Sequence, residues 1–488
     1  MARIRRVKTA SGKTAIQVVE RSGLLRRTKI IKHIGSGDSG AEIENLLTLA
    51  QKYLDSEEKT KPLFPELFES PKYDLVSKSH IKAKAGKHNF AYEFLDEYYK
   101  LNGFDDLNNK LLKDLSIMRI IDPCSKLRSI SLLNKYFGIV YPKNSLYLKL
   151  PLINNLKIDA EKVAVNYARK NLSFDFSLVF FDVTTLYFET FKEDKDNFRK
   201  PGFSKDGKHA QPQILVSLVV TKEGYPIAAD IFEGNTFEGH TIIPVILNFK
   251  NTHKITNLTV VADAGMLSLE NTQKLTEKNL NYIVGARLSN IPLKTIKEMA
   301  NYLDKKEGTY FQTETINGTL ICDYSIKRAI KNKFDREKQI KKAQSQINNP
   351  GKIKKLRFLK QTSKQKFELN QRLIEKQELL DGIKGYLTNL KEINPKLIIL
   401  RYKDLWHVEK SFRIAKSDLQ TRPIYHYKLE NVKAHILIVF VALAISKSIE
   451  IKLNKSIQNI KNKIWETQDI ELHDTLTNKT WTVRTDEY

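Results

Sequence analysis

The sequence predicts an α/β fold for the part of the chain that carries its chemistry. Strand-like and helix-like segments alternate over residues 177–286, which is the pattern of a sheet covered by helices. Two strand segments, Leu178–Thr185 and Leu258–Gly265, run through apolar or β-branched residues into a single Asp. A hydrophobic content of 41% over 488 residues allows roughly three domains with real cores.

Residues 1–60 predict a small β/α module. Alternation over Arg3–Lys8 and the β-branched run Thr14–Glu20 predict a hairpin, and Thr28–Ile34 is a third strand candidate. A capping box and an apolar stripe at helical spacing then predict one helix. Their residues are Ser39 and Glu42, followed by Ile43, Leu46, Leu47, Ala50 and Leu54. The basic side chains of this module could bind DNA, or could equally form a solvated face.

Residues 61–90 are charged and interrupted by proline, and we expect a linker there. Residues 91–175 show helical periodicity and predict a helical domain. Its apolar faces include Phe94, Leu95, Tyr98 and Tyr99, and then Leu111, Leu112, Leu115 and Met118. A purely structural core is the favoured interpretation of these faces, and a share of DNA binding is the alternative.

Residues 176–286 predict the first part of an α/β core, in the order β-β-β-α-β-α-β. Three antiparallel strands followed by two strands reached through crossovers make a mixed five-stranded sheet. The strands are Ser177–Tyr187, Gln213–Thr221, Tyr225–Phe232, Leu258–Ala262 and Asn281–Ala286. The first helix covers Thr241–Phe249, and Ser268 caps the second.

Residues 287–390 interrupt this rhythm and predict a mixed β/helical insertion domain. Thr309–Asp323 predicts a β-hairpin that turns at Asn317-Gly318. Phe334–Glu378 is highly charged and predicts a helical hairpin broken near Asn348–Gly351. A charged helical pair is usually solvated surface, and direct DNA contact is the alternative.

Residues 391–455 predict the second part of the core, and residues 456–488 a C-terminal tail. The α/β pattern resumes at Gly385–Thr388, after which one long helix covers Pro395–Lys416. A second, apolar helix covers Val432–Ile451. Its longest apolar run, Ile436–Ile445, is ten residues, which is too short to span a bilayer.

The charge of the chain favours an anionic polymer as its partner. Lys and Arg number 82 against 56 Asp and Glu, a formal net charge of +26. Such an excess attracts phosphate backbones without specifying a sequence. The alternative is the ordinary basic composition of a Lys-rich proteome. Two cysteines, Cys124 and Cys322, favour neither a disulfide framework nor a zinc module. The charged N-terminus has no apolar stretch behind it, so it does not resemble a signal peptide, and we expect the protein to be cytoplasmic.

Three carboxylates are the candidate metal ligands. Asp182 and Asp263 each follow a buried strand, where a carboxylate has a high desolvation cost. Pairing with a cation or binding to a metal would offset that cost. Two such residues in a basic protein predict a hard-cation site that works on an anionic polymer. Glu409 is the third candidate, because helical spacing places it on one face with Tyr402 and Lys416. Nearby, we expect Trp406 in the core and His407 to be incidental.

These residues resemble DDE transposases of bacterial insertion sequences. The likeness is carried by Asp182–Thr185, Val261–Gly265 and the spacing Tyr402, Glu409, Lys416. Within these transposases, the chain resembles the insertion sequence four superfamily. Members of that superfamily have a long insertion before the catalytic Glu and a Tyr-x2-Arg-x3-Glu-x6-Lys signature. Leu405 occupies the Arg position of that signature, so Arg413 or Lys403 compensates or the phosphate contact is absent. Further stretches of the same kind are Asp122–Leu127, Gly202–Lys208, Phe232–Thr236 and Leu419–His426.

The resemblance implies a ribonuclease-H-like core and two-metal chemistry. Asp182, Asp263 and Glu409 would be the catalytic residues and would bind two Mg²⁺ ions, with Mn²⁺ as a possible substitute. One ion would activate water and then the DNA 3′-hydroxyl, and the other would stabilise the leaving oxygen. The residues expected to bind DNA are Tyr402, Lys416, Lys205, Lys208 and Arg413.

The function implied is a transposase that cleaves DNA at element ends and joins the 3′ ends to target DNA. Its partners would be double-stranded DNA, as terminal repeats and as target, and a second copy in a homodimeric DNA complex. It would act in the bacterial cytoplasm near the nucleoid, without a membrane. Two alternatives stay open: a metal-dependent nuclease or resolvase on the same fold, and a non-catalytic basic DNA-binding regulator.

Overall fold

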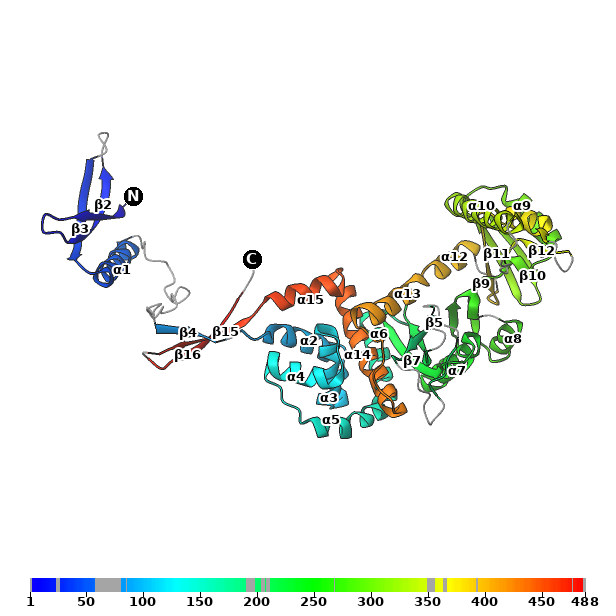
Figure 1. The fold of residues 1–488 in the computed structure, drawn as a ribbon, viewed down its shortest axis with the longest axis horizontal. Coiled ribbons are helices and arrows are strands. Elements are labelled where there is room, and N and C mark those ends of the chain that lie inside the picture. Colours follow the sequence, from blue (N-terminus) through cyan, green and yellow to red (C-terminus); the bar gives the residue numbers. More distant parts are fainter. Residues whose placement is uncertain are drawn as a thin grey trace. The chain divides into compact units, whose positions relative to one another are not determined.

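The computed structural model describes twelve segments of the chain. They are residues 2–22, 27–57, 80–84, 86–189, 198–202, 207, 211–266, 268–348, 356–362, 367–391, 394–475 and 477–485. The chain divides into two compact units, Met1–Ile81 and Lys82–Tyr488, each of which is described by itself (Figure 1). None of the helices within these segments is long and apolar enough to cross a bilayer.

The N-terminal unit is an antiparallel three-stranded sheet with one helix, as the sequence predicts. Its elements are β1 (Ala2–Lys8), β2 (Thr14–Ser22), β3 (Arg27–Gly37) and α1 (Gly40–Glu57), with β2 central. Ile16, Val18 and Ala50 form its buried core. Ser39 Oγ accepts the Glu42 N–H at 3.3 Å, and Glu42 Oε2 accepts the Asp38 N–H at 3.2 Å. The capping pair therefore fixes where α1 begins.

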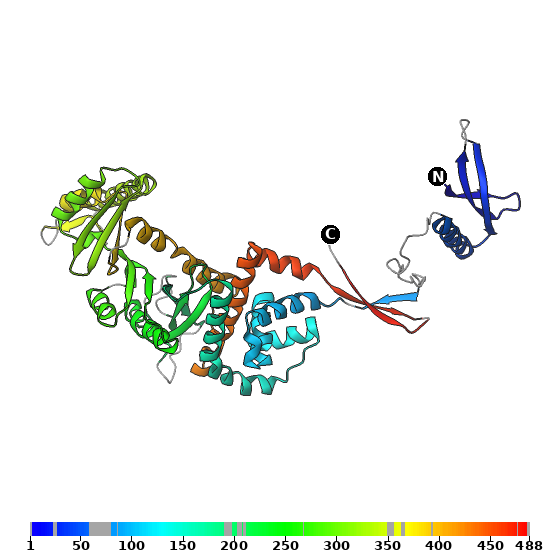
Figure 2. The ribbon, with the colours of Figure 1, turned by 180° about the vertical axis from the view of Figure 1, so that it is seen from behind.

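Helices from both ends of the larger unit share one core with the sheet. The early helices are α2 (Asn89–Leu101), α3 (Lys110–Ile121), α4 (Lys126–Phe137), α5 (Lys143–Lys149) and α6 (Lys157–Asn171). Helices α2, α3 and α6 pack on α14 (Leu429–Leu453), which also contacts the sheet, and α4 packs on α2, α3 and α5 (Figures 1 and 2). Since α14 is apolar on nearly all sides, it can be buried between the two layers.

The segments expected as linker and tail contain regular structure. Residues 456–488 carry α15 (Ile457–Glu466), β15 (Asp469–Asp474) and β16 (Thr480–Arg484). Strand β4 (Ile81–Ala83) joins them in a sheet of order β16-β15-β4. Residues 58–79, most of the expected linker, lie outside the described residues.

The main sheet has eight strands in the order β10-β11-β14-β9-β8-β5-β6-β7. In chain order they are β5 (Leu178–Tyr187), β6 (Gln213–Val220), β7 (Pro226–Glu233), β8 (Thr259–Ala262), β9 (Asn281–Ala286), β10 (Tyr310–Thr315), β11 (Gly318–Tyr324) and β14 (Ile383–Thr388). Strands β5, β8 and β9 are parallel and the other pairs antiparallel. With α7 (Ile242–Thr252) and α8 (Leu269–Glu277), the predicted order β-β-β-α-β-α-β is confirmed.

The predicted five-stranded sheet is too small, because the insertion extends it. Strand β14 pairs antiparallel with β9, from Gly385 opposite Ala286 to Thr388 opposite Ile283. Without that partner, β9 would present unpaired N–H and C=O groups at a sheet edge. The predicted hairpin β10–β11 then pairs with β14 and completes the sheet.

The rest of the insertion differs from the predicted helical hairpin. It contains α9 (Leu293–Leu303), α10 (Ile326–Asn348), β12 (Leu359–Gln361), β13 (Phe367–Leu369) and α11 (Gln371–Leu379). Phe358 and Ile374 pack on Ala343 in a small separate core, so a short two-stranded sheet covers the end of α10. The break predicted near Asn348–Gly351 falls mostly outside the described residues.

The single helix predicted over Pro395–Lys416 is in fact three segments. They are α12 (Pro395–Lys403), α13 (Trp406–Arg413) and a π-helical turn over Ile414–Asp418. Helix α12 packs on β8, β9, β10 and β14, and α13 packs on β5 and β6. The bend at residues 404–405 lets one stretch of chain follow the twisted sheet across most of its strands.

Candidate active site

Two strands deliver a carboxylate each at the point where their parallel ladder ends. The last paired residues of β5 and β8 are Phe181 and Ala262, and Asp182 and Asp263 follow them directly. Adjacent strands lie about 4.8 Å apart, so the two Asp residues leave the ladder as neighbours. Both strands end where the sequence predicts, β8 at Ala262 and β5 at Tyr187, because β5 continues past Asp182 alongside β6. Asp182 is therefore a mid-strand residue.

The two carboxylates have different surroundings. Asp182 is half-buried, and its Oδ1 accepts the N–H of Val183 at 2.7 Å. Asp263 is exposed, and its Oδ1 accepts a hydrogen bond from the Tyr402 hydroxyl at 3.1 Å. One residue of the predicted helix thus reaches across the sheet to hold one of the predicted metal ligands.

Tyr402 lies at the end of α12 in a close-fitting position. Its ring packs edge-on against Tyr386 of β14, with centroids 5.0 Å apart. A Cβ on Gly285 of β9 would lie 2.7 Å from the Tyr402 hydroxyl oxygen and 3.1 Å from the Ala264 Cβ. Burial, and then the charge of Asp263, raise the pKa of Tyr402. The hydroxyl therefore stays protonated and acts as a donor.

Lys384 on β14 is a cation of this site that sequence reasoning missed. Its Nζ lies 4.4 Å from the centre of the Tyr402 ring. Burial lowers the pKa of Lys384, as does Arg328, and the nearby carboxylates of Asp263 and Glu409 oppose that shift. The sequence carries no signal for it, because residues 287–390 read as an insertion outside the core.

Glu409 lies on α13, exposed to solvent and within electrostatic range of this group. Its charge acts on both Tyr402 and Lys384. Within the described segments, no three His, Cys, Asp or Glu side chains gather closely enough to hold a metal ion. The chemistry of the donors fits a hard divalent cation, since carboxylates, water and phosphate oxygens are its usual ligands. The register of β5 and β8 thus makes Asp182 and Asp263 neighbours at the end of the ladder, and Glu409 acts electrostatically on Tyr402 and Lys384 beside them.

Helix α13 is fixed against the turn that joins β6 and β7. Ser411 Oγ donates to the carbonyl oxygen of Gly224 at 2.7 Å. Gly224 has a φ of +81°, and a Cβ there would lie 3.0 Å from the His407 carbonyl oxygen. Only glycine suits both the backbone and the close approach. This contact positions the helix that carries Glu409.

The predicted DNA-binding residues are placed unevenly. Lys416 lies in the π-helical turn, half-buried, and lines a cavity of about 30 Å³ together with Thr184 of β5. Arg413 is exposed on α13. Lys205 and Lys208 lie outside the described residues, as does most of the stretch Gly202–Lys208.

Two residues beside the bend differ from the sequence interpretation. Leu405, at the position of the signature Arg, is buried in the main core. Trp406, predicted as core, is 50% exposed and stacks on His407 with ring centroids 3.9 Å apart. The turn between α12 and α13 points Leu405 inward, so Trp406 is left at the surface. Burial lowers the pKa of His407.

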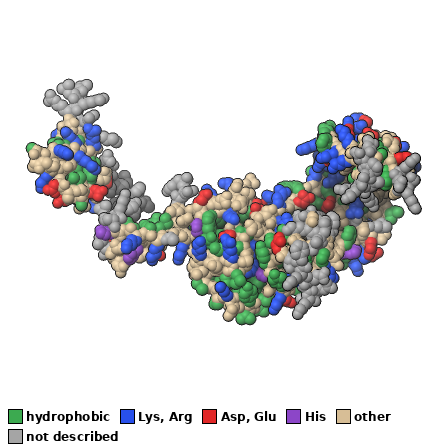
Figure 3. Space-filling view, viewed as in Figure 1, with side chains coloured by type: hydrophobic (Ala, Val, Ile, Leu, Met, Phe, Trp, Pro, Cys, Tyr) green, Lys and Arg blue, Asp and Glu red, His purple; other side chains and the backbone are tan. Residues whose placement is uncertain are grey.

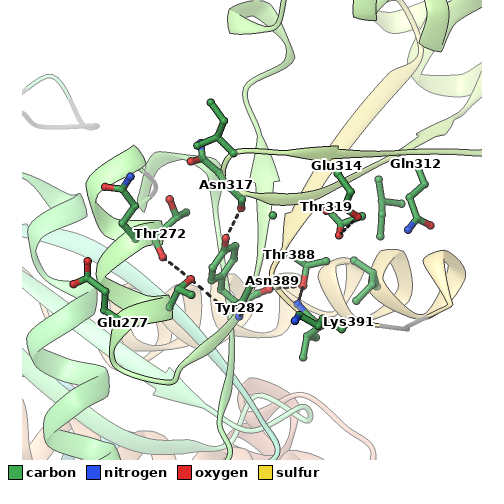
Figure 4. A pocket seen from close by; sticks show the side chains of 17 residues that line it. Thr272, Glu277, Tyr282, Gln312, Glu314, Asn317, Thr319, Thr388, Asn389 and Lys391 are labelled. Atoms are coloured by element: carbon green, nitrogen blue, oxygen red, sulfur yellow. Dashed lines mark hydrogen bonds between the residues drawn. The ribbon is translucent and has the colours of Figure 1, made fainter.

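A separate hollow of about 910 Å³ lies between α8, β9 and the β10–β11 hairpin (Figure 4). In it the Tyr282 hydroxyl donates to the Asn317 carbonyl oxygen, and Thr388 Oγ1 donates to the Tyr282 carbonyl oxygen at 2.7 Å. These bonds tie the hairpin of the insertion to the core. The described residues that line the hollow include none of the candidate catalytic residues, so we assign it a structural role.

Comparison with known proteins places the carboxylates within one family match. A family model described as a transposase DDE domain matches residues 173–445, which is more than half of the chain. This stretch contains Asp182, Asp263 and Glu409. No match is found among curated proteins.

Solved structures give weaker similarities. A piggyBac transposase synaptic complex with hairpin DNA is 11% identical, with a TM-score of 0.38, over 78% of this chain and 79% of that one. A Mos1 transposase paired-end complex with the left transposon end is 12% identical, with a TM-score of 0.15, over 50% and 68% of the two chains.

Proposed function

The chain belongs to the transposase DDE domain family, and from this premise we propose that it cleaves DNA at the ends of its insertion sequence and joins the 3′ ends to target DNA. The observation that carries the proposal is the pair Asp182 and Asp263 at the end of the β5–β8 ladder, with the Tyr402 hydroxyl on Asp263. The insertion ahead of Glu409 and the spacing from Tyr402 to Lys416 support the insertion sequence four superfamily and a ribonuclease-H-like core.

Divalent metal ions are the cofactor that DDE transposases generally use. We propose that Asp182, Asp263 and Glu409 hold two Mg²⁺ ions, for which Mn²⁺ could substitute. Bound ions would make water or a 3′-hydroxyl a better nucleophile and would stabilise the leaving oxygen. Glu409 lies on α13, exposed to solvent, where its charge acts on Tyr402 and Lys384 beside Asp263.

The protein's own groups prepare this site in defined ways. The hydrogen bond from Tyr402 orients the Asp263 carboxylate and leaves its second oxygen available to a cation. Lys384 supplies a positive charge beside the carboxylates, which limits their mutual repulsion. Lys416 and Arg413, with Lys205 and Lys208, are proposed to contact DNA phosphates near the cut.

Basic surfaces away from the carboxylates would hold the rest of the DNA. Figure 3 shows Lys and Arg side chains gathered where Figure 1 places α10, and that helix exposes Lys327, Lys331, Lys338 and Lys341. Strand β1 exposes Arg3, Arg5, Arg6 and Lys8 in the N-terminal unit. We propose that β1 helps to recognise the terminal repeats, that two copies act together on a pair of ends, and that they do so in the bacterial cytoplasm.

The deciding experiment is cleavage and strand transfer with the full chain. A labelled duplex that carries the DNA flanking the gene is incubated with Mg²⁺, Mn²⁺ or EDTA, beside a duplex of random sequence. Cuts at the element boundary, and joined products in the presence of target DNA, are the expected result. Cuts without joining would instead make the protein a nuclease or resolvase. Binding without metal-dependent cutting would make it a non-catalytic regulator.

A further inference from the structure

Two sequence stretches that the proposed reaction leaves unused face each other across one cavity. They are Asp122–Leu127, which joins α3 to α4 and includes the first two residues of α4, and Leu419–His426, after the π-helical turn. The cavity has a volume of about 1020 Å³. Its lining comes from α3, α4, α5 and the start of α14 as well as from the two stretches.

The lining of this cavity is strongly basic. Of the described residues that form it, five are Lys or Arg, two are His and none is Asp or Glu. The cations are Arg119, Lys126, Arg128, Arg422 and Lys428. The first turns of α4 and α14 also contribute to the lining, and the N-terminus of a helix favours an anion. The electrostatic character of the whole cavity is therefore positive.

Two buried side chains of this cavity, Lys126 and His435, each have a polar atom without a hydrogen-bond partner among the described residues. Lys126 is 4% exposed and Arg119 is 5% exposed. Within the described part of the chain, nothing pairs with Lys126 Nζ or with His435 Nδ1. Since His435 Nε2 lies 3.0 Å from the Thr421 carbonyl oxygen, Nε2 carries the proton and Nδ1 is left open. A buried ammonium without a partner is unstable unless an anion accompanies it.

The basic groups also act on one another. His426 and His435 lie with ring centroids 5.7 Å apart. Burial lowers the pKa of His426 to about 4, and Lys126 and Arg119 add to that effect. The same causes lower the pKa of His435. With their pKa values lowered, both imidazoles are neutral near pH 7, and a bound anion would favour the charged forms of Lys126 and Arg119.

We propose that this cavity binds a backbone phosphate of a DNA strand, with a neighbouring base stacked on the tyrosines at its rim. The proposal rests on the proposed DNA function. The volume exceeds the needs of a bare phosphate, and three exposed tyrosines line the opening. They are Tyr147, Tyr425 and Tyr427, which are 53%, 62% and 66% exposed. Aromatic side chains beside cations are the usual platform for nucleotides.

The position of the cavity links it to the catalytic strand. The N–H of Ile424 donates to the Tyr187 carbonyl oxygen at 3.3 Å, so this loop is attached to the far end of β5. Tyr187 lies five residues after Asp182, a distance of roughly 17 Å along a strand. That span corresponds to about five nucleotide steps of B-DNA, so one strand could reach both places.

The test compares Lys126→Met with Lys135→Met in the full chain. Lys135 is exposed on the same helix and is not part of the cavity lining, so its variant removes one charge in the same region. Inorganic phosphate, a duplex carrying the element end and a random duplex are the probes. Phosphate should raise the melting temperature of the wild type and of Lys135→Met, but not of Lys126→Met.

DNA binding should follow the same division between the two variants. Lys126→Met should lose roughly tenfold in duplex affinity, and the slope of log affinity against log salt should fall by about one. Tyr425→Leu should weaken DNA binding and keep the response to phosphate, since it removes a stacking surface and no charge. Tyr425 is exposed, so this variant also serves if Lys126→Met does not fold.

Two outcomes would overturn the inference. Equal phosphate responses and salt slopes in Lys126→Met and Lys135→Met would show that the cavity binds no phosphate. The second outcome is that the wild type responds to phosphate while Lys126→Met and Tyr425→Leu both keep wild-type affinity for DNA. That result would show that the cavity is a site for a free anion and not for DNA. Metal-dependent cleavage by the wild type is scored separately, so failure of the proposed function is distinguishable from failure of this site.

Discussion

Replacing Gly285 with Ala should damage the site without touching any carboxylate. The new Cβ would lie 2.7 Å from the Tyr402 hydroxyl oxygen, which must retreat by about 0.7 Å to reach an ordinary contact of 3.4 Å. The hydrogen bond to Asp263 is already 3.1 Å long, and a retreat of that size takes it past a useful length. Ala264, at 3.1 Å from the new atom, limits movement on the other side.

The expected magnitudes follow from these contacts. Overpacking of this kind costs about 1–3 kcal/mol of unfolding free energy. Loss of a hydrogen bond to a charged acceptor costs about 1.5–3 kcal/mol, toward the lower end here because Asp263 is exposed. If that loss appears in the transition state, cleavage slows by roughly tenfold. Cleavage rates at saturating metal and thermal melting of the same preparations measure the two effects.

The matched control is Gly265→Ala, two residues after Asp263, where a Cβ would meet nothing within 4 Å. It should leave stability and cleavage near wild type. Tyr402→Phe removes the atom that the new Cβ would strike, so Gly285→Ala should cost much less in that background. If Gly285→Ala cleaves and melts like wild type, or if its cost adds fully to that of Tyr402→Phe, the reasoning about this contact is wrong.

The remaining predictions concern the carboxylates, the charge, the N-terminal unit and pH. Asp182→Asn, Asp263→Asn and Glu409→Gln should each abolish cleavage and keep gel-shift binding; near-normal Mg²⁺-dependent cutting by Glu409→Gln would reject that residue as a ligand. Duplex affinity should fall by about 10³ or more between about 50 and 200 mM salt; a flat profile would argue against phosphate contacts. A chain starting at Lys82 should stay folded and bind random DNA but lose its preference for terminal repeats; full end preference would place recognition in the larger unit. Because the pKa of His426 is lowered from 6.5 to about 4, the unfolded chain binds more protons in that window, so stability should fall as pH drops through it. His426→Gln should flatten that fall in melting experiments, and an equally steep fall in the variant would contradict the assignment.

The sequence alone predicts those features that depend on local periodicity and spacing. The apolar runs into Asp182 and Asp263, the hairpin at Asn317-Gly318 and the Ser268 cap all appear as predicted. Each depends on a few neighbouring residues whose alternation, turn chemistry or capping is local. The spacing of seven residues between Tyr402 and Glu409 is also a local feature. It predicts a helical region here, and in the structure α12 and α13 of this region pack against the sheet.

The tertiary structure decides which of these residues meet. It adds three strands of the insertion to the sheet, which brings Lys384 beside the carboxylates, and it bends the long helix so that Leu405 is buried and Trp406 is exposed. It also places Asp122–Leu127 and Leu419–His426 around one basic cavity, although about 300 residues separate them. No local pattern encodes such contacts. They follow from the order in which strands pair and from side chains that fill the spaces between distant segments. The need for glycine at residue 285 is therefore evident only from the structure, where the Tyr402 hydroxyl lies against Gly285.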